Sequence, residues 1–101
     1  QKPEGAALVR DLAQRADVFV ENSKAGSLEK LGLGAAQLRA LNPRLVTCSI
    51  TGFGPDGPYA KRPAYDVIMR GMAGLMSTVG EADGPPTRTA IPIADLFTGM
   101  T

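Results

Sequence analysis

The sequence predicts an α/β fold in which a parallel sheet is flanked by helices. Short runs rich in β-branched residues alternate along the chain with segments of helical periodicity, and clusters of turn residues separate them. The order strand, helix, strand, helix, strand is the pattern of right-handed βαβ units in a parallel sheet. With 101 residues, the chain is long enough for one domain at most.

The first half supplies a leading helix and two strands. Residues 3–15 show helical spacing of apolar side chains, and Pro3 suits a first helical turn. Residues 17–22 contain three consecutive apolar residues and predict a strand buried on both faces. Residues 35–41 predict a helix that ends before a proline, and residues 45–50 predict the second strand.

The second half begins with a long loop. Residues 51–63 are rich in glycine and proline, and loops of this length in compact domains are usually functional or disordered. A helical stripe then predicts a helix over residues 65–76, followed by a second loop over 80–86. Residues 87–93 predict a third, extended strand that delivers Asp95 to the start of a further element.

In parallel sheets, ligands bind beyond the carboxyl ends of the strands. Three segments follow the predicted strands, at residues 21–26, 51–58 and 94–95. We therefore expect these segments to converge on one site. Their position alone does not identify the chemistry.

The composition excludes several functions. The sequence has no histidine, which excludes a Ser-His-Asp relay, a Cys-His relay and a histidine-ligated zinc ion. The single cysteine, Cys48, excludes an internal disulfide and a thiolate metal cluster, and we expect it to be an inert core thiol. One cysteine also fits a reducing compartment, and we expect the protein to be cytoplasmic.

The charge and hydropathy patterns argue against nucleic acid and membranes as partners. The net charge is +1, without the clustered basic residues or stacking rings of a nucleic-acid footprint. No apolar stretch approaches the ~20 residues that a membrane-spanning helix needs. We therefore expect neither nucleic acid nor a membrane as a partner.

Two glycine-rich motifs have structural explanations. Gly32 and Gly34 match two of the three glycines of a dinucleotide fingerprint, but no strand directly precedes them, which favours a helix-start and packing role. The stretch 52–58 follows a strand and its N–H groups could cradle a phosphate. Because it lacks the Lys-Ser/Thr of a P-loop and contains two prolines, a structural turn is the better interpretation.

Asp95 is the most informative acidic residue. It follows an apolar extended run and precedes Leu96 and Phe97, so we expect its carboxylate near the end of the sheet in a partly apolar setting. It either caps the next helix or acts in catalysis. In a chain without histidine, a catalytic aspartate points to covalent catalysis by the carboxylate itself.

A family resemblance extends this interpretation. Residues 17–34 read D-V-F-V-E-N-S-K-A-G-S-L-E-K-L-G-L-G and resemble the D-V-x-V-E-N-F-R-P-G-V-x-E-R-L-G-L-G stretch of the class III CoA-transferases, the CaiB/BaiF family. Further blocks continue the resemblance in order over essentially the whole chain, at residues 41–46, 49–54, 57–59, 65–66, 80–88 and 93–95.

The resemblance implies an activity. Members of the family transfer coenzyme A from an acyl-CoA donor to a carboxylic acid acceptor, through an aspartyl anhydride and an aspartyl-CoA thioester. Asp95 matches the aspartate nucleophile of the family. Coenzyme A is then a substrate rather than a permanently bound cofactor, and no metal is implied.

The resemblance also implies a CoA-binding site. Asn22 and Ser23 match positions near the nucleotide. Lys24 and Lys30 match family arginines, and the arginine at the position of Lys30 reaches the CoA phosphates. Leu31 matches an apolar contact to the adenine. Lysine in place of arginine keeps the positive charge but loses the planar fork of the guanidinium.

Tyr65 matches a family tyrosine near the pantetheine arm and the reacting centre. Related α-methylacyl-CoA racemases have a histidine at this position as one of two proton-transfer bases. A phenol is a poor base at neutral pH, so racemase activity is the less favoured alternative.

The resemblance further implies that residues 1–101 are a partial CoA-transferase family III domain, part of a Rossmann-like large domain. The family's enzymes are several times longer and form interlocked homodimers. We expect the N-terminal strands and the C-terminal domain to lie outside this chain, and the isolated chain to be incomplete and inactive. A remaining alternative is a non-catalytic piece that only binds CoA or a partner chain.

Overall fold

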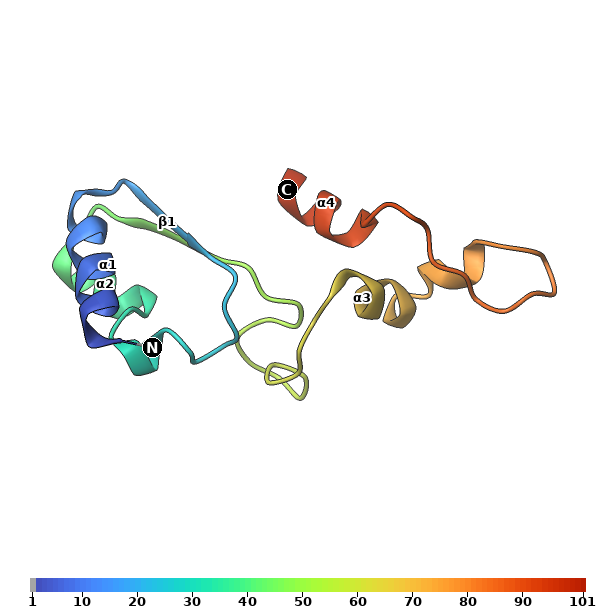
Figure 1. Ribbon diagram of the computed structural model, residues 1–101, viewed down its shortest axis with the longest axis horizontal. Coiled ribbons are helices and arrows are strands. Elements are labelled where there is room, and N and C mark those ends of the chain that lie inside the picture. Colours follow the sequence, from blue (N-terminus) through green and yellow to red (C-terminus); the bar gives the residue numbers. More distant parts are fainter. Residues whose placement is uncertain (1) are drawn as a thin grey trace. The chain divides into compact units, whose positions relative to one another are not determined.

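The computed structural model describes residues 2–101 and divides the chain into two compact units (Figure 1). The first unit extends to Arg62 and the second covers Pro63–Thr101. The first unit contains the strands, and the second contains short helices. None of the helices in the described residues is long and apolar enough to cross a lipid bilayer.

The first unit forms a βαβ arrangement preceded by a helix. Its elements are helix α1 (Pro3–Arg15), strand β1 (Val18–Glu21), the 3-10 turn η1 (Glu29–Leu31), helix α2 (Ala35–Leu41) and strand β2 (Val46–Ser49). The two strands pair in parallel, with Val18 opposite Val46 and Glu21 opposite Ser49. The predicted α/β class with a partial parallel sheet and flanking helices is confirmed.

The core of the first unit lies between the two helices and one face of the strand pair. Ala13, Leu33, Leu38 and Leu45 are buried, and Phe19 of β1 packs against them. α1 and α2 lie together beside the strands (Figure 1).

Asn42 joins the ends of these two helices. Its Nδ2 donates to the carbonyls of Ala13 and Ala16 at 3.1 and 2.9 Å, and its Oδ1 accepts the Arg44 N–H at 3.1 Å. Carbonyls at the end of α1 would otherwise lack intrahelical donors.

The other face of the strand pair is exposed. Val18, Val20 and Val46 are 55%, 60% and 61% exposed, and Cys48 is exposed as well. The prediction that the first strand is buried on both faces is therefore wrong for the described residues, as is the core position predicted for Cys48. Both predictions assumed a second covering layer, and in these residues α1 and α2 pack only on the face that carries Phe19.

Glycines shape the turn before α2. Gly32 ends η1 with φ 70°, a conformation that glycine adopts without strain. Gly34 is buried at the start of α2, and its N–H donates to Gln37 Oε1 at 2.8 Å. The predicted helix-start and packing role of these glycines is confirmed.

The second unit contains helix α3 (Asp66–Met72), the 3-10 turn η2 (Leu75–Thr78) and helix α4 (Ile93–Met100). The predicted helix over residues 65–76 ends early, because Gly74 adopts φ 77° and breaks it. The prediction of a third strand over residues 87–93 is wrong for this structure. The described residues form a two-stranded sheet, and residues 87–92 before α4 form no strand and bend at Ala90 and Ile91, while Ile93 already belongs to α4.

Candidate functional site

Glu21 organises the carboxyl end of the strand pair. Ser49 lies opposite it and donates its hydroxyl proton to Glu21 Oε1. The Ser23 N–H donates to Glu21 Oε2 at 2.6 Å. The Glu21 carboxylate is thus occupied in joining the two strand ends and turning the chain after β1.

The predicted CoA-contacting residues follow this turn. Asn22 and Lys24 are exposed and Ser23 is half-buried, while Lys30 is exposed on η1. Within residues 2–101, no hydrogen bond or ion pair engages the ammonium group of Lys24 or Lys30. Both positive charges are therefore free to meet an anionic group. Leu31 is half-buried and packs against the core, so only part of its side chain is available to a ligand.

An open groove lies next to these residues. It has a volume of about 530 Å³ and is lined by Ala25 and Gly26 from the loop after β1, and by residues 55–58, 60 and 61 from the loop after β2. Two of the three segments expected to converge therefore do meet, as the parallel strand order requires. The groove falls within the range of small-molecule sites, about 300–1,000 Å³.

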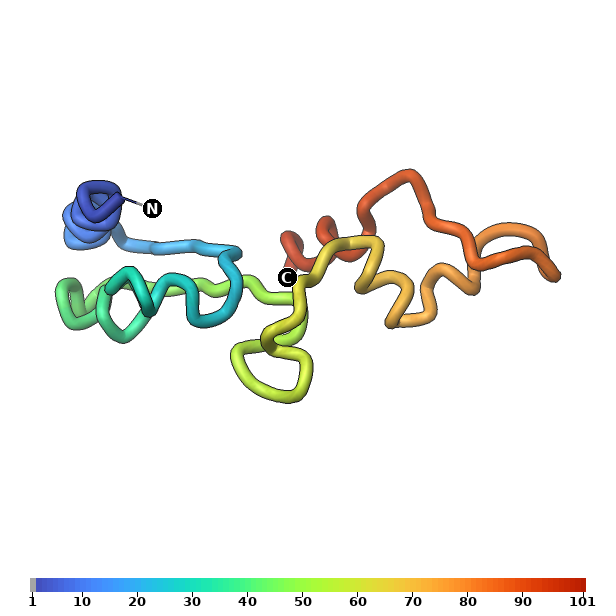
Figure 2. The backbone as a smooth tube through the Cα atoms, turned by 60° about the horizontal axis from the view of Figure 1, so that its bottom comes forward, coloured from blue at the N-terminus to red at the C-terminus, as the bar shows by residue number. Residues whose placement is uncertain are grey.

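The loop after β2 is held by its own side chains, as expected for a structural turn. Thr51 Oγ1 accepts the Gly54 N–H at 2.8 Å. The rings of Phe53 and Tyr59 pack edge to face with centroids 5.6 Å apart, and the Arg62 guanidinium lies 4.4 Å from the Tyr59 ring centroid. Figure 2 shows the chain turning back on itself here. This aromatic and cation–π cluster was not predicted from the sequence.

Asp95 lies in the first turn of α4 in the second unit. The prediction that Asp95 caps this helix is wrong, because the N-cap residue is Pro92 and no side chain of α4 provides a capping hydrogen bond. The expected partly apolar setting at a strand end is also wrong, since within residues 2–101 no strand leads directly into α4 and Asp95 is exposed. Among residues 2–101, its carboxylate takes part in no hydrogen bond or ion pair.

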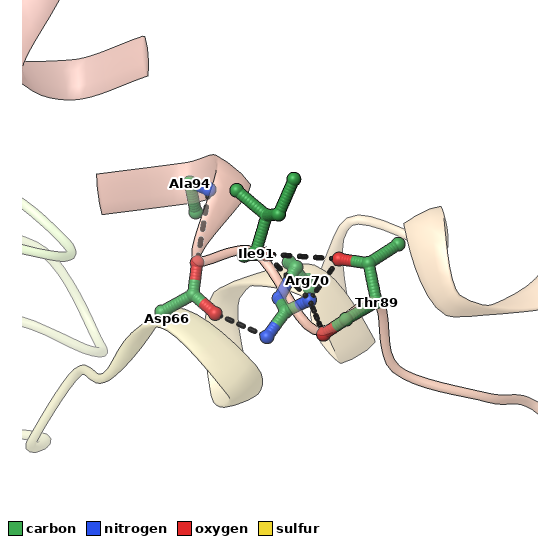
Figure 3. Close-up of polar contacts among 5 residues, drawn as sticks. All are labelled: Asp66, Arg70, Thr89, Ile91 and Ala94. Atoms are coloured by element: carbon green, nitrogen blue, oxygen red, sulfur yellow. Dashed lines mark hydrogen bonds and ion pairs between the residues drawn. The ribbon is translucent and has the colours of Figure 1, made fainter. Parts of the chain in front are cut away.

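Tyr65 lies at the start of α3 and is 68% exposed. The next residue, Asp66, accepts the backbone N–H of Ala94 with Oδ1 at 2.9 Å (Figure 3). Ala94 directly precedes Asp95. The structure thus brings the neighbours of Tyr65 and Asp95 together through one hydrogen bond.

Asp66 was not among the residues that the sequence predicts for the site. The structure shows that it binds the amino end of α4 and that it also pairs with Arg70 one turn later on α3. The one signal in the sequence was the i, i+4 spacing of an acidic and a basic residue, which is common on exposed helices.

The candidate site residues divide between the two units. Five of them, Asn22, Ser23, Lys24, Lys30 and Leu31, belong to the first unit, and Tyr65 and Asp95 belong to the second.

The chain is similar to known proteins along its whole length. A model of the family described as CoA-transferase family III matches residues 1–101. A succinate–glutarate CoA-transferase of Agrobacterium fabrum is 54% identical over 98 residues, which are 97% of this chain and 24% of that protein. A formyl-CoA:oxalate CoA-transferase of Streptomyces avermitilis is 44% identical over 96 residues, 95% of this chain and 23% of that protein.

The fold has solved counterparts. The crystal structure of a CaiB/BaiF family protein from Brucella suis is similar with a TM-score of 0.92 and 49% identity, and the match covers 98% of this chain and 26% of that one. The chain therefore spans about a quarter of the length of the relatives that it matches. Through a family match over every residue, close relatives and a shared fold, the chain belongs to CoA-transferase family III.

Proposed function

We propose that this chain is part of a longer enzyme that transfers coenzyme A from an acyl-CoA to a free carboxylic acid, with Asp95 as the nucleophile. The observation that carries the proposal is an Asp95 carboxylate that is exposed and unengaged within the described part of a family III chain. Asp66 in the same unit is bound on both oxygens. Of these two acids, Asp95 is the one free to react.

The proposed chemistry is an exchange of acyl groups between anionic nucleophiles. A carboxylate oxygen of Asp95 attacks the thioester carbonyl, the C–S bond breaks, and CoA leaves as a thiolate. The thiolate attacks the aspartyl carbonyl of the resulting anhydride, the C–O bond breaks, and the donor acid leaves as a carboxylate. The acceptor carboxylate then reverses both steps and restores Asp95. No net proton is consumed, in agreement with a sequence without histidine.

Water must be kept from this chemistry, because anhydrides and thioesters hydrolyse. We propose that the longer protein supplies this protection together with acyl selectivity. We also propose that it acts in the cytoplasm as an interlocked homodimer.

The first unit is proposed to bind the nucleotide end of CoA. Lys24 and Lys30 carry unengaged positive charges on the segment that follows β1, which suits phosphate groups. Asn22 and Ser23 lie on the same segment, and the exposed part of Leu31 is proposed to contact the adenine. Tyr65 of the second unit is proposed to lie by the pantetheine arm.

A small dicarboxylic acid is the proposed acceptor. The names of the relatives refer to succinate, glutarate and oxalate, all of which are dicarboxylates. The first assay is therefore succinyl-CoA with glutarate, followed by oxalate.

The test uses the full-length protein that contains this chain. Incubation with succinyl-CoA and hydroxylamine is expected to leave a hydroxamate on Asp95, detectable by peptide mass spectrometry. Asp95→Ala and Asp95→Asn are expected to lose both the hydroxamate and CoA transfer. Asp11→Asn is the matched control, because Asp11 is an exposed carboxylate on α1, and it is expected to keep full activity.

Transfer by an enzyme whose Asp95 stays unmodified would overturn the mechanism. Deuterium exchange at the acyl α-carbon without an acceptor acid would identify a racemase instead. Calorimetric binding of CoA without turnover would identify a binding protein.

A further inference from the structure

We propose that Arg70 is a positioning residue that holds, through Asp66 and Thr89, the amino end of the helix that presents Asp95. This inference rests on the proposed function, since Asp95 is the group being positioned. Arg70 is charged yet only 4% exposed. A buried charge is costly unless it is paired and hydrogen-bonded, so the contacts of its guanidinium group identify what it holds.

One side of the guanidinium holds the segment that leads into α4. Arg70 Nη1 donates to the Thr89 carbonyl at 3.0 Å, to Thr89 Oγ1 at 2.5 Å and to the Ile91 carbonyl at 3.3 Å (Figure 3). The Thr89 hydroxyl in turn donates to the Ile91 carbonyl at 2.9 Å. Three oxygens thus converge on one nitrogen, and the backbone from Thr89 to Ile91 bends around it.

The other side of the guanidinium holds α4 itself, through a carboxylate. Arg70 Nη2 forms an ion pair with Asp66 Oδ2, while Asp66 Oδ1 accepts the Ala94 N–H at 2.9 Å. The N-cap of α4, Pro92, has no side chain able to accept a hydrogen bond. Asp66 on α3 therefore accepts a backbone N–H of the first turn of α4, which is the role that an N-cap side chain has within its own helix.

These contacts hold the chain on both sides of Pro92 in the sequence. Thr89 and Ile91 are held before it, and Ala94 is held after it. The first turn of α4 cannot rotate or slide without breaking at least one of these bonds. Because Asp95 directly follows Ala94, its position depends on the same bonds.

Positioning explains this arrangement better than stability does. A buried ion pair contributes little net stability compared with well-packed apolar side chains. A nucleophile, in contrast, must approach the thioester carbonyl along a narrow path, and a displacement of ~1 Å can cost roughly 100-fold in rate. Arg70 also pairs with the Asp66 carboxylate, which accepts the N–H of the residue directly before Asp95.

The test compares variants of the full-length enzyme in kcat, KM for succinyl-CoA and the rate of hydroxamate formation at Asp95, each per folded molecule. Arg70→Gln is expected to lower kcat and trapping roughly 100-fold, with KM within about twofold of wild type. Thr89→Val, which is isosteric but lacks the hydroxyl, is expected to lower kcat about tenfold. Thr89→Ser keeps the hydroxyl and is expected to restore wild-type kcat. Arg15→Gln, an exposed arginine on α1, is the control.

Several outcomes would overturn the proposal. If folded Arg70→Gln has a lower melting temperature but wild-type kcat and trapping, the network is only structural. If Arg70→Gln does not fold, the Thr89 pair decides, and equal kcat for Thr89→Val and Thr89→Ser counts against positioning. Full activity of Asp95→Asn would instead overturn the proposed function. Loss of activity in Asp95→Asn with wild-type kcat in the other variants would overturn the positioning role alone.

Discussion

The residues proposed to bind coenzyme A and the residue proposed to react with it differ in how firmly the chain holds them. Lys24 and Lys30 are exposed side chains without partners in residues 2–101, and long flexible ammonium groups of this kind act as point charges. Asp95 is also exposed, but it follows a backbone N–H that is fixed by Asp66. Flexible charged side chains suffice to bind a flexible nucleotide, whereas a nucleophile must be held in a fixed position relative to the atom that it attacks.

Lys30 allows a test of the binding charges. Lys30→Gln is expected to weaken CoA binding by up to about fivefold, because an exposed ion pair contributes only about 0.2–1 kcal/mol. Lys30→Arg is expected to bind at least as tightly as wild type, since its fork can contact two phosphate oxygens. Isothermal titration of the full-length protein with CoA at low salt measures both changes. Lys2→Gln removes the same charge before α1 and serves as the control; a loss equal to that of Lys30→Gln would mean that net charge alone is responsible.

At the scale of elements, the turn between η1 and α2 sets where the residues after β1 lie. A Cβ added to Gly34 would lie 2.9 Å from Glu29 Cγ, 3.0 Å from Gln37 Oε1 and 3.4 Å from the backbone Cα of Glu29. Gly5 on α1 offers the opposite case, since nothing lies within 4 Å of an added Cβ. Alanine substitutions at these two glycines are therefore expected to change the free energy of unfolding in opposite directions.

Gly34→Ala is expected to lower the free energy of unfolding by about 1–2 kcal/mol, because the tight site must open to admit the methyl group. Gly5→Ala is expected to raise the free energy of unfolding by up to about 1 kcal/mol, because alanine favours the helix. Urea denaturation of the full-length protein measures both. Equal effects of the two substitutions would contradict the close packing seen at Gly34.

The elements set by local sequence could be predicted. Helices α1 and α2 follow from apolar spacing and from a proline that ends the second, and strands β1 and β2 follow from β-branched runs. The third strand was predicted wrongly, because an alternating pattern favours an extended segment but does not show whether a neighbouring strand pairs with it. The early end of α3 depends on the left-handed conformation of Gly74, which periodicity does not show.

The candidate site was predictable only in part. Parallel strand order placed the loops after β1 and β2 together, and the groove between them follows from topology. The network around Arg70 was missed because it joins residues far apart in the chain, such as Asp66 and Ala94, 28 positions apart. Contacts of this kind depend on tertiary packing, which the local sequence does not specify.

At the scale of the whole molecule, apolar side chains remain at the surface. The strand face opposite Phe19 exposes Val18, Val20 and Val46, and α4 exposes Phe97 and Met100 at 64% and 79%. Large exposed apolar patches usually mark an interaction surface. The chain spans 24% of its Agrobacterium relative, so further polypeptide is available in proteins of this family to cover such faces.

Substitutions on the exposed strand face test whether it is covered in the full-length protein. Val18→Thr with Val20→Thr keeps β-branched side chains but adds hydroxyls. In the isolated chain, the pair is expected to raise soluble yield, because it reduces an exposed apolar face. In the full-length protein, it is expected to lower the free energy of unfolding by about 1–3 kcal/mol per site, the cost of burying an unpaired hydroxyl.

Val9→Thr is the control for this comparison, because Val9 already packs against the core of the first unit within this chain. It is expected to destabilise both proteins. The melting temperature and the soluble yield of each variant are measured side by side in the isolated chain and in the full-length protein. Unchanged stability of the full-length Val18→Thr, Val20→Thr variant would mean that water reaches this face there too. A general effect of threonine on strand stability would lower the melting temperature of both proteins equally, so a loss confined to the full-length protein would show that this face is covered there.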